Sequence, residues 1–186
     1  MKKLLFKSIM LFLLFILGLK GNSQDVSMNK SMKMDALPSI KAICVLYPTV
    51  GNTVSGIIIF TQTEKGVKIE VNVQGLSKGK HGFHIHEFGD CSAPDGTSAG
   101  GHFNPEGKTH GAPMDMSHHM GDMGNIEADD SGKAHLEYVD PMMSLTGEKS
   151  IMGRSVILHK NEDDMKTQPS GNAGPRIACG VIGVAK

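Results

Sequence analysis

The sequence has no tryptophan, few aromatic residues (5%) and no excess of either charge. Its 19 lysine and arginine residues balance 19 aspartate and glutamate residues, so the formal net charge is zero. A protein that binds nucleic acid through the phosphates needs a basic surface, and the balanced charge therefore argues against nucleic acid as a partner. A chain of 186 residues is long enough for one domain with a single hydrophobic core.

Long apolar runs are missing except near the N-terminus. There a lysine-rich start precedes an apolar run over residues 9–19, which is typical of a signal peptide and too short to span a bilayer comfortably. Small residues at Gly21 and Ser23 predict a signal peptide over residues 1–23, cleaved after Ser23. We therefore expect an exported protein, periplasmic or secreted, with no stable membrane association after cleavage. A retained N-terminal membrane anchor is the alternative.

The segment that follows is mainly polar and lacks periodicity. Residues 24–36 are polar, so we predict a flexible lead-in there and a single folded domain over residues 37–186.

Cysteine is also scarce, with only three residues. Cys44 lies in an apolar run, where a cysteine usually acts as a small buried hydrophobe, so we expect it to be free. Cys91 and Cys179 lie in glycine-flanked, loop-like segments. Because export leads to an oxidising compartment, we predict that these two form a disulfide.

No stretch shows the 3.6-residue apolar repeat of an amphipathic helix. Instead, residues 67–73 alternate apolar and polar side chains, which predicts a half-buried strand. Further strands are predicted at 40–46, 54–61, 81–87, 134–139, 155–159 and 176–184. Short strands separated by glycine-bearing turns favour an antiparallel sandwich or barrel. The region from 88 to about 130 is predicted to be a long functional loop.

Histidines are concentrated in and around that loop. His84 and His86 are two residues apart, which places them on one face of a strand, although two surface histidines would give the same pattern. Three imidazoles and a carboxylate downstream have the composition of a closed zinc site, unless they form a solvated loop: His102, His110, His119 and Asp122. His159 ends an apolar run, typical of a packed core histidine; joined to His84, His86 and one end of the loop cluster, it would give an all-nitrogen copper site.

Four motifs carry a resemblance to a known family. Residues 81–90, 98–105, 153–156 and 171–183 resemble copper/zinc superoxide dismutases, in the same order and over most of the chain from residue 40. The resemblance implies an all-β, immunoglobulin-like Greek-key sandwich or flattened barrel of about eight antiparallel strands, with long metal-binding and electrostatic loops. It implies dismutation of superoxide to dioxygen and hydrogen peroxide through a Cu(II)/Cu(I) cycle, as antioxidant defence outside the cytoplasm.

The resemblance also implies roles for individual residues. The implied copper ligands are His84, His86, His102 and His159, and the implied zinc ligands are His102, His110, His119 and Asp122. His102 would then bridge both metals and act in catalysis. The choice of His119 over His118 follows the family spacing His-x-Gly-Asp. Asp163 matches a carboxylate that orients ligand histidines of both metals, and Arg176 matches the arginine at the mouth of the copper channel.

Several features leave alternatives open. A copper-binding or delivery protein would keep the metals without turnover, and a cupin-type oxygenase would use His84, His86 and Glu87. Only sixteen residues separate His159 from Arg176, so the electrostatic loop is expected to be short. A homodimer is possible, but no residue identifies its surface.

Methionine is abundant in two segments. It is frequent over residues 114–123 and again at Met28, Met32 and Met34. A flexible surface without a role is the simpler interpretation. Collection of copper for the active site is the alternative hypothesis, because thioethers favour Cu(I).

Overall fold

The computed structural model of the protein describes residues 40–186, which contain eight strands, one short 3-10 helix and no α-helix. The elements are β1 (Lys41–Pro48), β2 (Ser55–Thr63), β3 (Gly66–Gln74), β4 (Gly79–His86), η1 (Thr97–Ala99), β5 (Asp122–Ala128), β6 (Ala134–Asp140), β7 (Ser155–His159) and β8 (Arg176–Val184). The all-β prediction is confirmed. No helix in this part of the chain is long and apolar enough to cross a membrane.

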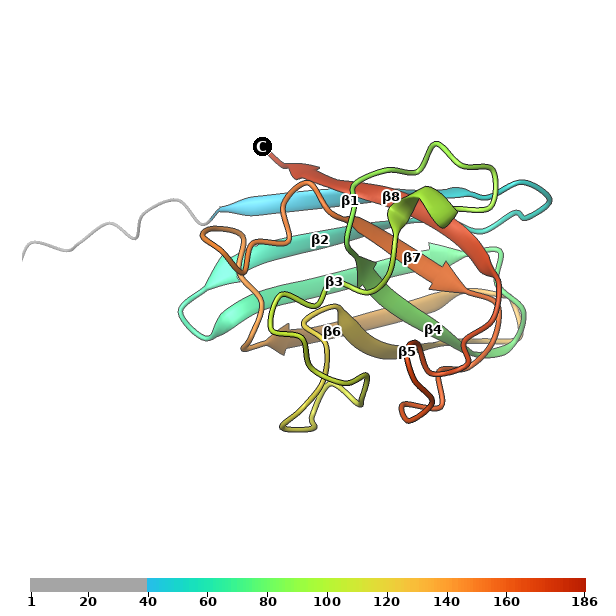
Figure 1. The fold of residues 1–186 in the computed structure, drawn as a ribbon. Helices are drawn as coiled ribbons and strands as arrows, with labels where there is room; N and C mark the ends of the chain where they lie inside the picture. Colours follow the sequence, from blue (N-terminus) through green and yellow to red (C-terminus); the bar gives the residue numbers. More distant parts are fainter. Residues whose placement is uncertain (1–39) are drawn as a thin grey trace, which may run out of the picture. The chain divides into compact units, whose positions relative to one another are not determined.

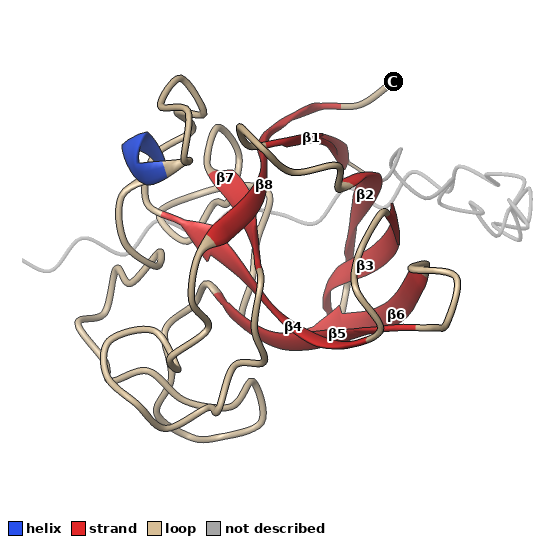
Figure 2. Cartoon of the chain, turned by 90° about the vertical axis from the view of Figure 1, so that its right-hand side faces the viewer, coloured by secondary structure: helices blue, strands red, loops and turns tan. Residues whose placement is uncertain are grey.

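All strand pairs are antiparallel, and the strands form one sheet in the order β5-β4-β7-β8-β1-β2-β3-β6. The sheet curls so that its two edge strands, β5 and β6, lie side by side and nearly close a barrel (Figures 1 and 2). The connections β3–β4, β5–β6 and β6–β7 join strands that are not neighbours in the sheet. This crossing pattern confirms the predicted Greek-key flattened barrel.

The core follows from alternation along the strands. In β3, Val67, Ile69 and Val71 are fully buried, whereas Lys68 and Glu70 between them point outward. Lys68 Nζ lies 3.4 Å from Glu70 and 3.0 Å from Glu137 on the neighbouring β6, so the outer face is held by ion pairs. The two faces of this strand therefore differ in solvent contact, as the sequence pattern requires.

One strand was not predicted. β5 lies inside the region expected to be a long loop, and it pairs with β4. Its buried apolar residues are Met123, Ile126 and Ala128, which do not follow a two-residue alternation, so the strand has no clear period-2 pattern. The loop prediction was therefore wrong at residues 122–128. The remainder of that region, apart from η1, lies outside the named strands.

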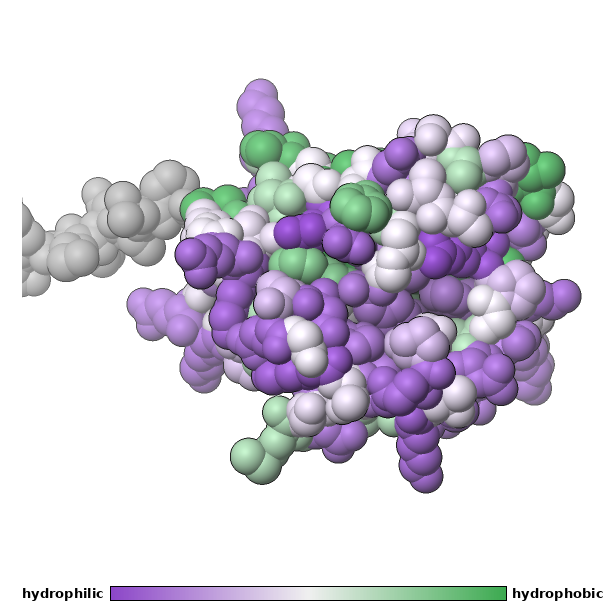
Figure 3. Space-filling model, viewed as in Figure 1, coloured by the Kyte–Doolittle hydropathy of each residue, from purple (hydrophilic) through white to green (hydrophobic). Residues whose placement is uncertain are grey.

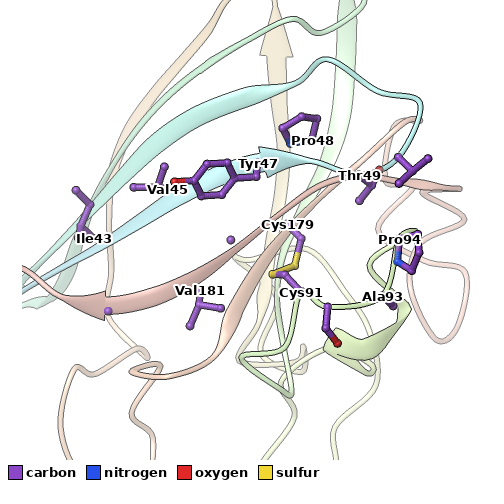
Figure 4. A pocket seen from close by; sticks show the side chains of 14 residues that line it. Ile43, Val45, Tyr47, Pro48, Thr49, Cys91, Ala93, Pro94, Cys179 and Val181 are labelled. Carbon is purple, nitrogen blue, oxygen red and sulfur yellow. A yellow bond between two sulfur atoms is a disulfide. The ribbon is translucent and has the colours of Figure 1, made fainter.

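The disulfide joins the loop after β4 to β8. Cys91 and Cys179 are bonded, with their Cα atoms 5.8 Å apart, and Cys44 is buried and free. Beside the disulfide, the outer faces of β1 and β8 form an apolar hollow that includes Val45, Tyr47 and Val181 (Figure 4). Most of the face seen in Figure 3 is hydrophilic, with hydrophobic residues gathered along its upper edge.

The predicted signal peptide over 1–23 and the predicted lead-in over 24–36 lie outside the described residues, as do Met28, Met32 and Met34.

Candidate metal centre

The first group of candidate ligands lies where two strands and a loop meet. His84 and His86 come from β4, His159 ends β7, and His102 lies in a loop segment that forms an isolated β-bridge to His86. One nitrogen from each ring lies within 4.8 Å of the others. Three of the rings are buried and His102 is nearly so.

In each of the four rings one nitrogen has a polar partner and the other has none. The partnered atoms are His84 Nε2 with Asp163 Oδ2 (2.7 Å), His86 Nδ1 with the Gly100 carbonyl (2.9 Å), His102 Nδ1 with Asp122 Oδ1 (2.7 Å) and His159 Nδ1 with the Gly174 carbonyl (3.0 Å). His84 Nδ1 and the Nε2 atoms of the other three rings are buried without a hydrogen-bond partner. Buried polar atoms are normally satisfied, so four unpartnered nitrogens around one point fit an ion that prefers imidazole, such as copper.

Burial also sets the protonation of these rings. Loss of hydration lowers the pKa of His84 to about 4 and that of His159 to about 3, and it lowers the pKa of His86 well below its usual value. His84, His86 and His159 are therefore neutral at pH 7, which is the form that binds a metal.

The second group surrounds one carboxylate oxygen. The Nδ1 atoms of His102, His110 and His119 lie 2.7, 3.0 and 3.3 Å from Asp122 Oδ1. Ligand atoms at the corners of a tetrahedron around zinc are about 3.3 Å apart when each metal–ligand distance is about 2.0–2.1 Å. The donor set and its spacing therefore fit zinc. His118 is excluded from both groups, and its Nδ1 donates to the His119 carbonyl at 2.7 Å.

In this second group, nearby carboxylates have a larger effect on histidine pKa values than in the first group. Burial alone would lower the pKa of His110, but hydrogen bonds to Asp122 and Asp163 outweigh it and raise that pKa to about 9. The pKa of Asp122 is held well below its usual value, because contacts with His102 and His110 outweigh the effect of burial. This region is therefore suited to hold a cation.

One carboxylate connects the two groups. Asp163 Oδ2 accepts from His84 Nε2 at 2.7 Å, and Asp163 Oδ1 accepts from His110 Nε2 at 3.0 Å. Gly171 packs against it so closely that an added Cβ would lie 1.7 Å from Oδ1. The carboxylate thus fixes one ring of each group, and a side chain at position 171 would displace it.

A pocket of about 400 Å³ opens onto the first group. It is lined by His86, His102, His159 and Arg176, among others. The Arg176 guanidinium donates to the carbonyls of Gly96 and Gly100, each at 2.7 Å. Both carbonyls belong to the segment that the disulfide attaches to β8, so the cation is fixed at the wall of the pocket.

The structure adds two residues that sequence reasoning missed. Gln168 exchanges two hydrogen bonds with the backbone of His110, each 2.8 Å long, and Asn125 exchanges two with the backbone of Asp163. No sequence signal marked them, because amide side chains are common in loops. Glu87 of the cupin alternative is exposed and belongs to neither group, and that alternative leaves the second group unexplained.

Comparison with known proteins agrees with the resemblance found in the sequence. The family model described as copper/zinc superoxide dismutase (SODC) matches residues 54–182. Superoxide dismutase A of the copper/zinc type from Xenopus laevis is 45% identical over 151 residues, which cover 77% of this chain and 97% of that relative. With the fold and two adjoining ligand groups in place, these matches show that the chain belongs to the copper/zinc superoxide dismutase family.

Proposed function

We propose that the chain dismutates superoxide to dioxygen and hydrogen peroxide, with copper held by the first ligand group and zinc by the second. The observation that carries this proposal is the set of four buried, unpartnered nitrogens at the pocket that Arg176 lines. Copper bound there would supply one-electron redox chemistry, and zinc, which has no redox chemistry, would supply charge and a fixed geometry.

His102 is the residue best placed to handle a proton. Its Nδ1 belongs to the zinc group and its Nε2 to the copper group, and the ring lines the pocket. Whenever Nε2 is not engaged as a ligand, it can hold a proton at the pocket and pass it to the reduced substrate.

Arg176 binds and orients the anion. Two of its five N–H donors are used by the Gly96 and Gly100 carbonyls, which leaves others for superoxide. A fixed positive charge at the wall of a pocket also raises the local concentration of an anionic substrate.

The test is catalysed loss of superoxide by residues 24–186 loaded with copper and zinc. We expect fast loss with the loaded protein and none with metal-free protein or with His86→Ala. A folded protein that holds both metals without turnover would contradict the proposal and favour copper binding or delivery. One iron or manganese per chain, in place of one copper and one zinc, would favour the cupin-type alternative.

We also propose export to the periplasm or the exterior, with residues 1–23 as the signal peptide and 37–186 as the mature domain. The basic and apolar N-terminal sequence supports this, and a disulfide is compatible with an oxidising compartment. Cell fractionation with N-terminal sequencing tests it. A full-length chain in the cytoplasmic fraction would contradict it.

Assembly forms the last part of the proposal: a second copy covers the outer apolar face of β1 and β8. Val45, Tyr47 and Val181 project from this face and are all exposed. Exposed apolar faces of this kind mark interaction sites. In a symmetric dimer the same face of both copies is buried, so no different partner protein is required. Sedimentation should show a dimer that Tyr47→Lys dissociates. Val139→Lys, at an exposed apolar residue of β6, is the matched control. A monomeric parent chain would contradict the dimer.

A further inference from the structure

Two methionines at the tip of the loop that carries the proposed zinc ligands are exposed to solvent. Met114 is 93% exposed and Met116 is 98% exposed, whereas Met120, Met123 and Met143 are 3% exposed. Methionine is among the residues most often buried, so two fully exposed thioethers one residue apart are unusual. Neither belongs to the two ligand groups described above.

The tip is a hydrogen-bonded turn. The Asp115 N–H donates to the Ala112 carbonyl at 2.9 Å, and the Ala112 N–H donates to Asp115 Oδ2 at 3.1 Å. At its base, the hydroxyls of Thr109 and Ser117 lie 3.3 Å apart. These contacts fix the backbone of the turn that carries the two exposed methionines, which are one residue apart.

The turn is attached directly to the second ligand group. The Gly111 N–H, one residue before the turn, donates to Asp122 Oδ2 at 3.1 Å. An ion held at the tip would therefore sit on the same loop as the zinc ligands.

A third methionine approaches this loop in an uncommon backbone conformation. Met165 has φ of 58°, in the left-handed region that costs a non-glycine residue of order 1–3 kcal/mol. Its methyl carbon and the Pro113 ring each lie 3.3 Å from the point that a Cβ on Gly124 would occupy. Met165 is therefore held beside the residue that precedes Met114.

We propose that Met114 and Met116, with Met165 as a neighbouring third thioether, form a surface Cu(I) site that supplies the copper centre. Thioethers are soft, neutral ligands that favour Cu(I), while imidazole and carboxylate suit zinc. The exposed Asp115 between the two methionines adds a negative charge that favours a cation. Transfer to the copper centre exchanges ligands around Cu(I) and needs no oxidant or reductant. The destination rests on the proposed function, whereas Cu(I) binding at the tip does not.

The experiment uses the mature chain with zinc bound and copper bound and reduced. Under anaerobic conditions, further Cu(I) is supplied in competition with bicinchoninate. We expect one additional Cu(I) per chain, lost in the double variant M114L/M116L. The matched control is M142L/M152L, which removes two half-buried thioethers elsewhere and should keep the additional ion. With methyl-labelled methionine, the NMR signals of Met114 and Met116 should shift and that of Met143 should not.

If the parent chain binds no additional Cu(I), the proposed site is refuted. It is also refuted if M114L/M116L still binds the additional Cu(I), because the ion would then be held elsewhere, such as on Met28, Met32 and Met34. The supply role is tested by loading zinc-bound protein from limiting Cu(I), followed by copper analysis. M114L/M116L should load several-fold more slowly than M142L/M152L, and equal rates overturn that role. Because these readouts do not measure turnover, a chain that binds the additional Cu(I) without consuming superoxide would refute the proposed function alone.

Discussion

Replacing both disulfide cysteines by alanine should destabilise the protein by several kcal/mol. Cys91 and Cys179 are 88 residues apart in sequence. For a loop of that length, the chain-entropy expression gives about 4.6 kcal/mol at 25 °C, because the bond restricts the unfolded chain. At a urea slope of about 2 kcal/mol/M, this loss would lower the unfolding midpoint by about 2 M.

The assay is urea unfolding of metal-free protein, so that metal binding does not add to the stability of the folded state. Reduced parent protein is the control and should unfold near the double variant. A loss below about 1 kcal/mol would refute the reasoning, since it would mean that the bond hardly restricts the unfolded chain. The metal-loaded variant should also lose activity, because the disulfide anchors the segment whose Gly96 and Gly100 carbonyls hold Arg176.

Three further predictions concern single residues. Asp163→Asn should weaken both copper and zinc about 10–100-fold, because an amide cannot accept from His84 and His110 at once; competition with chelators measures this, and loss of one metal alone would contradict it. In metal-free protein, stability should fall as pH drops below about 6.5, the unfolded histidine value, because His84 and His159 resist protonation until about pH 4 and 3. Each ring would cost about 2 kcal/mol at pH 5, and equal urea midpoints at pH 7 and 5 would contradict this. Burial raises the pKa of Cys44 to about 12, so native protein should resist iodoacetamide at pH 8 while urea-unfolded protein reacts; mass spectrometry reads both, and rapid native labelling would show the thiol to be accessible.

The sequence predicted strands where the two faces of a strand differ strongly in polarity. β3 is the clearest case, because valine and isoleucine alternate with charged or polar residues along it. β5 escaped prediction because its buried apolar residues, Met123, Ile126 and Ala128, are irregularly spaced and one of them is small. In a narrow barrel, small residues can fill inward positions, and only the partner strand reveals the need for them.

The candidate ligands were predictable for a different reason. Metal ligands are chemically distinctive, and the spacing of His84 and His86 suggested a pair on one face of a strand, while the full ligand sets were implied by the resemblance to copper/zinc superoxide dismutases. Gln168 and Asn125 instead bind backbone atoms 58 and 38 residues away in the chain. No local pattern encodes such a contact, because any amide in a loop has the same composition.

The Gly100 carbonyl accepts hydrogen bonds from both His86 Nδ1 and the Arg176 guanidinium. A single peptide group thus sets the orientation of a proposed copper ligand and the position of the proposed anion-binding cation. Gly100 has φ of 76°, and an added Cβ would lie 2.7 Å from the Phe88 ring, so a side chain at position 100 would disturb this peptide. Under the proposed function, the reduction potential of the copper and the capture of superoxide would therefore be coupled through this peptide. A substitution in this segment that changes the reduction potential would then also change the binding of superoxide. To change either property alone, substitutions would have to be made elsewhere in the pocket.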